Sequence, residues 1–93
     1  MIRCIVELFG LSGDITDLRK VEVELKDEAG LKDLVAALTR RIPALEGSVI
    51  RAGEDRLVDH YAFNINGRFY VDDRELQLQS GDRVALLTLA FGG

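Results

Sequence analysis

The sequence predicts a two-layer α+β domain in which a single helix packs across a sheet of four or five strands. Three observations predict this fold class. They are two alternating segments near the N-terminus, one segment with a helical period, and an Asn-Gly turn between two β-rich runs. The 93 residues fit one domain, and neither a repeat nor a Pro/Gly-rich linker divides them. We therefore expect residues 1–93 to form one domain.

The N-terminal segments read as a β-hairpin. Residues 2–9 alternate between an apolar face and a mixed face, as a strand with one buried side does. The apolar face carries Ile2, Cys4, Val6 and Leu8, and the mixed face carries Arg3, Ile5, Glu7 and Phe9. A second strand is predicted at residues 18–25, with Arg19, Val21, Val23 and Leu25 on one face. The short glycine-bearing loop between the two segments favours antiparallel pairing.

One stretch changes to a helical period. Its apolar residues fall on a single stripe, namely Leu31, Leu34, Val35, Leu38 and Ile42. Asp27 and Glu28 precede the predicted helix, and Arg40 and Arg41 lie at its end, in keeping with the helix dipole. Pro43 then stops the helix.

The C-terminal half is predicted to return to strands. Residues 44–59 read as a loop with a short strand around residues 49–50. Asn66-Gly67 joins two β-rich runs, residues 61–65 and 68–71, and predicts a second hairpin. After a Ser80-Gly81-Asp82 turn, residues 84–90 form the last predicted strand, and the sequence ends in Gly92-Gly93.

Composition narrows the classes of function. A net charge of −4 argues against nucleic-acid binding and favours partners that are basic or apolar at the contact. Cys4 is the only cysteine and His60 the only histidine, so we expect no metal site, a buried Cys4 and a solvated or capping His60. We read residues 54–56 and 72–73 as solvated loop charges. The N-terminal apolar run is too short for a membrane span and lacks a signal peptide's layout, so we expect a cytoplasmic protein with no membrane association.

The element order, Asn66-Gly67, the run from Ser80 to Leu87 and the final Gly92-Gly93 together resemble the ubiquitin-like β-grasp sulfur carriers MoaD and ThiS. The length is closest to the MoaD type. This resemblance implies a mixed β-grasp sheet in which the last strand lies in the middle, beside the first. MoaD tails often carry prolines near the end, whereas residues 88–91 here read Thr-Leu-Ala-Phe. That difference leaves the pathway open.

The resemblance also implies a reaction at the C-terminal glycine. In such carriers an E1-like enzyme of the MoeB/ThiF type uses ATP to adenylate the terminal carboxylate, and a sulfur donor converts the adenylate to a thiocarboxylate. The chain would then be a carrier and not an enzyme, and the partner would bind the ATP. Gly93 would carry the acyl group, with Gly92 beside it, because a Cβ at either position would crowd the reacting carbon or widen the tail.

Strand parity predicts the partner surface. Counting back from the diglycine in a ubiquitin-like fold points Val84, Leu86, Thr88 and Ala90 toward the core. Leu87, Leu89 and Phe91 would then form an apolar partner surface beside the tail.

Several functions remain open at this point. The favoured pathway is molybdopterin synthesis, in which the sulfur acceptor would be the large subunit of molybdopterin synthase. Sulfur delivery for thiamine, cysteine or thiolated tRNA is an alternative, as is attachment to protein lysines. A ubiquitin-like interaction module that is never activated is another.

Overall fold

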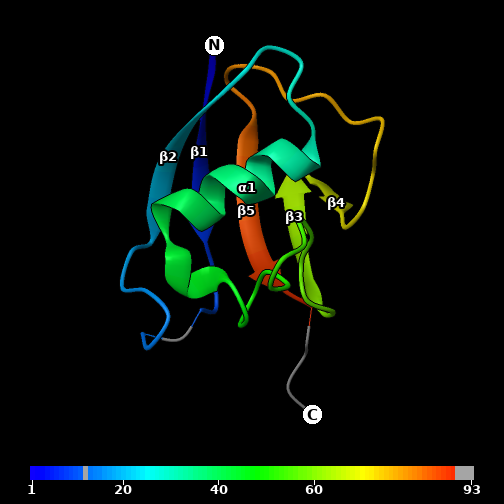
Figure 1. Cartoon of the computed structure of the whole chain (residues 1–93). Helices are drawn as coiled ribbons and strands as arrows, with labels where there is room; N and C mark the ends of the chain where they lie inside the picture. The colour runs from blue at the N-terminus through cyan, green and yellow to red at the C-terminus, as the bar shows by residue number, and fades with distance from the viewer. Residues whose placement is uncertain (12, 90–93) are drawn as a thin grey trace.

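Helix α1 crosses one face of a five-stranded mixed sheet, so the molecule has two layers (Figure 1). The computed structural model describes residues 1–11 and 13–89. The strand order is β2-β1-β5-β3-β4. This is the predicted fold class, and it has the ubiquitin-like β-grasp arrangement that the resemblance implied.

The N-terminal hairpin is confirmed. Strand β1 (Ile2–Leu8) pairs antiparallel with β2 (Lys20–Leu25), in a register that runs from Ile2 opposite Leu25 to Glu7 opposite Lys20. The predicted apolar faces point into the core, where Cys4 and Val6 are fully buried. On the exposed side, the Arg3 guanidinium lies 3.4 Å from the Glu24 carboxylate. Because both side chains are exposed, we expect this pair to add less than about 1 kcal/mol.

Helix α1 (Leu31–Arg41) is the next element after β2 and packs against it. The Asp33 carboxylate accepts a hydrogen bond from the Gly30 N–H at 2.9 Å, which fixes the first turn. A Cβ at Gly30 would lie only 3.3 Å from the Leu76 carbonyl oxygen, so glycine lets the two segments approach closely. All five residues of the predicted stripe are buried, and the helix ends just before Ile42 and Pro43 as expected.

The segment between α1 and β3 differs from the prediction. It contains a short 3₁₀-helix, Pro43–Leu45, and Ile50 makes only isolated bridges to Glu46 and Leu57. The short strand predicted around residues 49–50 is therefore wrong. This irregular segment nevertheless contributes to the core, because Leu45, Val49, Ile50 and Leu57 are buried.

The second hairpin is confirmed. Strands β3 (Tyr61–Ile65) and β4 (Arg68–Tyr70) pair antiparallel, and the predicted second run is one residue shorter than expected. Asn66 and Gly67 both have positive φ, 53° and 92°, which a two-residue hairpin turn of type I′ requires.

Strand β5 (Arg83–Thr88) occupies the centre of the sheet (Figure 1). It runs parallel to β1 and antiparallel to β3. The resemblance-based expectation for the last strand is therefore confirmed. The strand starts one residue earlier than predicted and ends at Thr88, while Ala90 and Phe91 lie outside the described residues. Val84 and Leu86 point into the core, in agreement with the parity argument.

Candidate functional site

The predicted partner surface lies along β5, on the sheet face opposite α1. Leu87 and Leu89 are half-buried there, whereas their neighbour Leu86 is fully buried under the helix. Phe91, Gly92 and Gly93 lie outside the described residues. The roles assigned to these five positions therefore remain predictions.

Further apolar side chains lie on the same outer face. Register places Leu87 beside Ala62, and the Phe9 N–H donates to the Leu86 carbonyl at 3.0 Å, which continues the β1–β5 pairing to Phe9. Ala62 is fully buried although it faces away from the core cluster. Phe9 and Ile5 on β1's side of the face remain about half exposed, at 51% and 50%.

We define the outer-face patch as Ile5, Phe9, Phe69, Leu87 and Leu89. Phe69 of β4 is 57% exposed. It pairs with Asn64 of β3, which lies opposite Ala85 of β5. Because Ala85 and Leu87 are on the same face of β5, Phe69 lies on the outer face as well. The apolar surface predicted from the sequence did not include Ile5, Phe9 and Phe69. For Ile5 and Phe9, the available signal was their place on the mixed face of the first predicted strand. Exposed apolar groups gathered on one face are typical of a protein-binding surface.

Cys4 is buried within the core face of β1. Burial, and secondarily the nearby Asp82 carboxylate, raises the pKa of the Cys4 thiol above its ordinary value of 9.0. A thiol that is inaccessible and holds its proton is a poor nucleophile. The expectation of a buried Cys4 is confirmed.

We therefore expect Cys4 in the folded protein to resist a thiol reagent such as DTNB at pH 8 and to react fully in denaturant. Because its folded-state pKa is raised, its contribution to stability is complete below the unfolded-state pKa and is lost as pH rises through the folded-state value. The difference between the urea midpoints of the wild type and Cys4→Val should thus stay constant up to about pH 9 and change only above it. Rapid labelling of the native protein would contradict this account.

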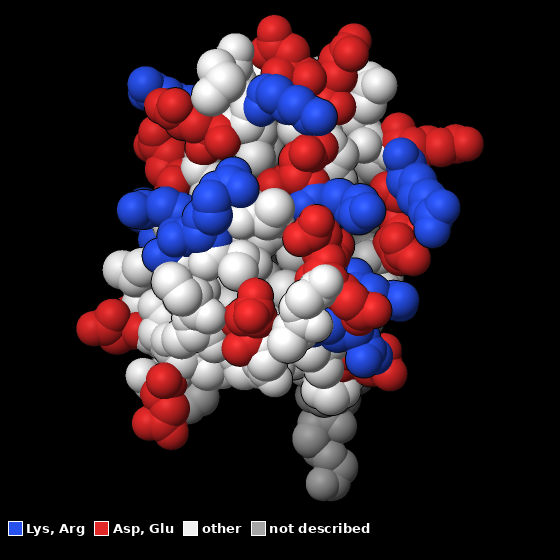
Figure 2. All heavy atoms as spheres, viewed as in Figure 1, with Lys and Arg blue, Asp and Glu red and all other residues white. Residues whose placement is uncertain are grey.

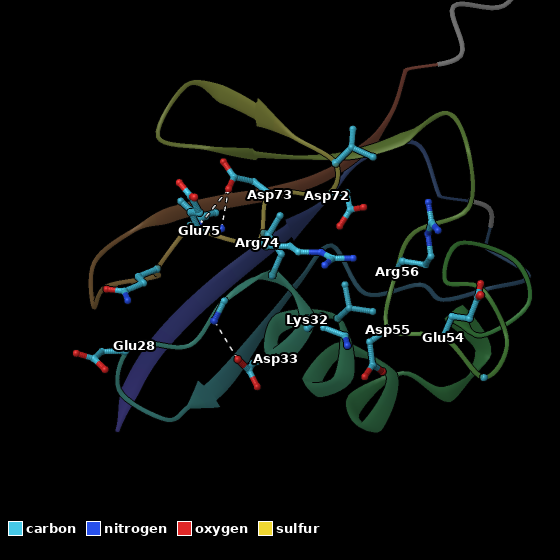
Figure 3. Close-up of a pocket in the computed structure, with 17 residues that line it drawn as sticks. Glu28, Lys32, Asp33, Glu54, Asp55, Arg56, Asp72, Asp73, Arg74 and Glu75 are labelled. Atoms are coloured by element: carbon cyan, nitrogen blue, oxygen red, sulfur yellow. Dashed lines mark hydrogen bonds between the residues drawn. The ribbon is translucent and has the colours of Figure 1, made fainter.

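A groove separates the start of α1 from the segment after β4 (Figure 3). It has a volume of about 1030 Å³, and its walls carry seven acidic and three basic side chains. The resulting charge of −4 equals that of the whole chain, so the excess negative charge is gathered here. The structure thus brings together the two loop clusters, residues 54–56 and 72–73, that sequence reasoning treated separately.

Part of this acidic charge has a local structural use. The Asp73 carboxylate accepts hydrogen bonds from the backbone N–H groups of Glu75 and Leu76, at 2.9 and 3.2 Å. Asp33 accepts the Gly30 N–H and lies 3.7 Å from the Lys26 ammonium. The description of residues 72–73 as merely solvated is therefore incomplete, since Asp73 fixes the turn that follows it.

Basic and acidic side chains are interspersed over the face seen in Figure 2. His60 is exposed, and its ring lies 5.2 Å from that of Tyr61. Within residues 1–11 and 13–89, no three His, Cys, Asp or Glu side chains are arranged to hold a metal ion. Across the same residues, no helix has the length and apolar character needed to cross a membrane.

Sheet order, the single crossing helix and the central last strand define a ubiquitin-like β-grasp domain. The chain belongs to the ThiS family, whose model matches residues 6–93. Members of the ThiS/MoaD group are small carrier or modifier proteins, generally without catalytic activity, that interact with E1-like and acceptor enzymes. A search of curated proteins finds no significant match.

Solved structures extend the comparison. SAMP1 from Haloferax volcanii superposes with a TM-score of 0.80 at 27% identity, covering 98% of this chain and 99% of that one. A Pyrococcus furiosus protein assigned as molybdopterin converting factor subunit 1 has a TM-score of 0.74 at 19% identity, covering 97% and 100%. Small archaeal modifier protein 1 from Methanosarcina acetivorans gives 0.73 at 21%, covering 100% and 98%. The latter two likenesses concern the fold alone.

Proposed function

We propose that this chain is a sulfur carrier whose Gly93 carboxylate is adenylated by an E1-like enzyme, converted to a thiocarboxylate and used as a sulfur donor. The observation that carries the proposal is the family match, which extends through Gly92 and Gly93. Molybdopterin synthesis is the pathway we favour, because the length of the chain and the Gly81-Asp82 pair before β5 resemble those of MoaD-type carriers. The acceptor would be the large subunit of molybdopterin synthase, and the reaction would take place in the cytoplasm.

The chemistry requires activation by a partner. A terminal carboxyl group has an ordinary pKa of about 3.3–3.7, so near neutral pH it is an ionised, weak electrophile. Its oxygen attacks the α-phosphorus of ATP, and pyrophosphate leaves. The sulfur nucleophile then attacks the acyl carbon and displaces AMP. This chain contributes the acyl group and the docking surface, while the ATP site belongs to the partner.

The position of β5 supports the proposal that this chain supplies the acyl group and the docking surface. The strand is held between β1 and β3 as far as Thr88, and the outer-face patch extends beside it. A rigid body, an apolar docking face and an acyl group a few residues beyond the last strand are what a carrier needs. We propose that the outer-face patch, with Phe91, seats the activating enzyme.

Attachment to protein amines is a second candidate. It is favoured by the likeness to SAMP1 at 27% identity over nearly the full length of both chains, because that protein is described as a small archaeal modifier. The same acyl-adenylate would serve either fate, since an amine or a sulfur nucleophile can displace AMP.

Intact mass spectrometry tests the proposal. The protein is incubated with ATP, its host's E1-like enzyme and a sulfur donor. We expect one oxygen-for-sulfur exchange located on Gly93, and no exchange in a variant that lacks Gly93. Lysine-linked conjugates formed without added sulfur donor would favour the modifier. An unchanged mass beside an enzyme active on its own control substrate would indicate a module that is not activated.

A further inference from the structure

At the C-terminal end of β5, backbone pairing with the chain before β3 continues one position beyond the two strands. The last β3–β5 pair is Tyr61 opposite Thr88. One position further, the Leu89 N–H donates to the His60 carbonyl oxygen at 2.6 Å, and the Thr88 hydroxyl donates to the same oxygen at 3.3 Å. We call His60, Thr88 and Leu89 the end clamp. The last two residues that the structure describes therefore both donate to the His60 carbonyl oxygen.

The backbone of His60 accounts for this arrangement. Its φ is +66°, in the left-handed region that most non-glycine residues avoid at a cost of about 1–2 kcal/mol. The Tyr61 N–H donates to the Val58 carbonyl at 3.2 Å, which closes the turn before β3. The chain thus turns sharply at His60 and leaves the His60 carbonyl directed at the end of β5. A left-handed residue that is held by surrounding contacts is often tied to function.

We propose that the end clamp positions the terminal segment for activation by holding Leu89 against the residue that precedes β3. The inference rests on the proposed function, because it concerns how the partner takes up Gly93. Ordering one more residue on binding costs about 1–2 kcal/mol in backbone entropy. If the clamp opened, the partner would have to immobilise Leu89 when it binds. The clamp lowers that entropic cost before the two proteins meet.

This role makes a specific kinetic prediction. Leu89→Pro deletes the N–H donor, and Leu89→Ala is the matched control, because both variants lose the leucine side chain but only alanine keeps the N–H. We expect Leu89→Pro to have a KM for the activating enzyme about tenfold above that of Leu89→Ala. The value of kcat should agree within about twofold, because the bound terminal segment occupies the same site in both.

A second pair of variants separates positioning from general stability. Thr88→Val removes the clamp's hydroxyl donor. Thr39→Val is its counterpart, because the Thr39 hydroxyl also donates to a carbonyl, that of Val35, at 3.0 Å within α1. We expect a KM increase of about threefold for Thr88→Val, from the loss of one modest hydrogen bond. Thr39→Val should keep the wild-type KM.

Hydrogen exchange measured by NMR gives an independent readout. The Leu89 amide should exchange as slowly as the amides of β5, and more quickly in Thr88→Val. An unprotected Leu89 amide, or equal KM values for Leu89→Pro and Leu89→Ala, would overturn the clamp while leaving sulfur carriage intact. If the wild type is not activated at all, the proposed function fails and the positioning role fails with it, even where the Leu89 amide is protected.

Discussion

Gly92→Val is expected to lower kcat/KM for adenylation by about a hundredfold or more, with no change in the free energy of unfolding. The β-branched side chain would widen the segment that must enter the partner's active site, next to the carbon that reacts. Displacing a reacting group by about 1 Å can reduce a rate a hundredfold. Residue 92 follows the last strand, so the body should keep its stability. Pyrophosphate release measures the activation, and a urea titration measures the stability.

Gly13→Val is the matched control for this substitution. Gly13 lies in the loop between β1 and β2, and a Cβ added there meets no atom within 4 Å. We expect this variant to be activated at the wild-type rate. Normal activation of Gly92→Val would contradict the assignment of Gly92 and Gly93 as the segment that enters the partner's active site. Equal loss in both valine variants would point to a general effect of the added side chain.

Two adjacent leucines of β5 should affect different properties when each is replaced by alanine. Leu86 is fully buried beneath α1, whereas Leu87 is half-buried on the outer face. We expect Leu86→Ala to lower the free energy of unfolding by about 2–5 kcal/mol, through lost burial and the cavity that remains. Because small domains are stable by only about 5–15 kcal/mol, that is a large share.

Leu87→Ala should instead weaken docking. We expect a loss of about 1 kcal/mol or less in stability and about a tenfold rise in the dissociation constant for the activating enzyme. Chemical denaturation and titration calorimetry on the two purified variants separate these effects. If Leu87→Ala bound the enzyme as tightly as the wild type, the outer-face patch would not be the docking surface.

Local patterns in the sequence were sufficient for most of the fold. Alternation at residues 2–9 and 18–25 predicted both N-terminal strands, which the structure shortens to Ile2–Leu8 and Lys20–Leu25. The stripe from Leu31 to Ile42 predicted the helix. Asn66-Gly67 predicted its hairpin because both residues tolerate positive φ. Each of these signals depends on residues close together in the chain. The central position of β5 was different, since it came from the resemblance to a family.

The features that sequence reasoning missed depend on distant contacts. Leu45, Val49, Ile50 and Leu57 are buried in irregular backbone, where no period of two or 3.6 residues announces burial. The outer-face patch requires the strand order that brings β1, β5 and β4 onto one face. Likewise, the end clamp joins His60 to Leu89 through backbone atoms, which residue identity does not encode.

The anchoring of Leu89 also sets a limit on distance. Four residues extend from Leu89 to Gly93, and a fully stretched chain spans about 3.3–3.6 Å per residue, or roughly 14 Å in all. While Leu89 stays anchored, an active site that acts on Gly93 would therefore lie no more than about 14 Å below the enzyme surface on which this chain docks. In an enzyme with a deeper active site, Gly93 would not reach the catalytic groups, however tightly the two proteins bound each other.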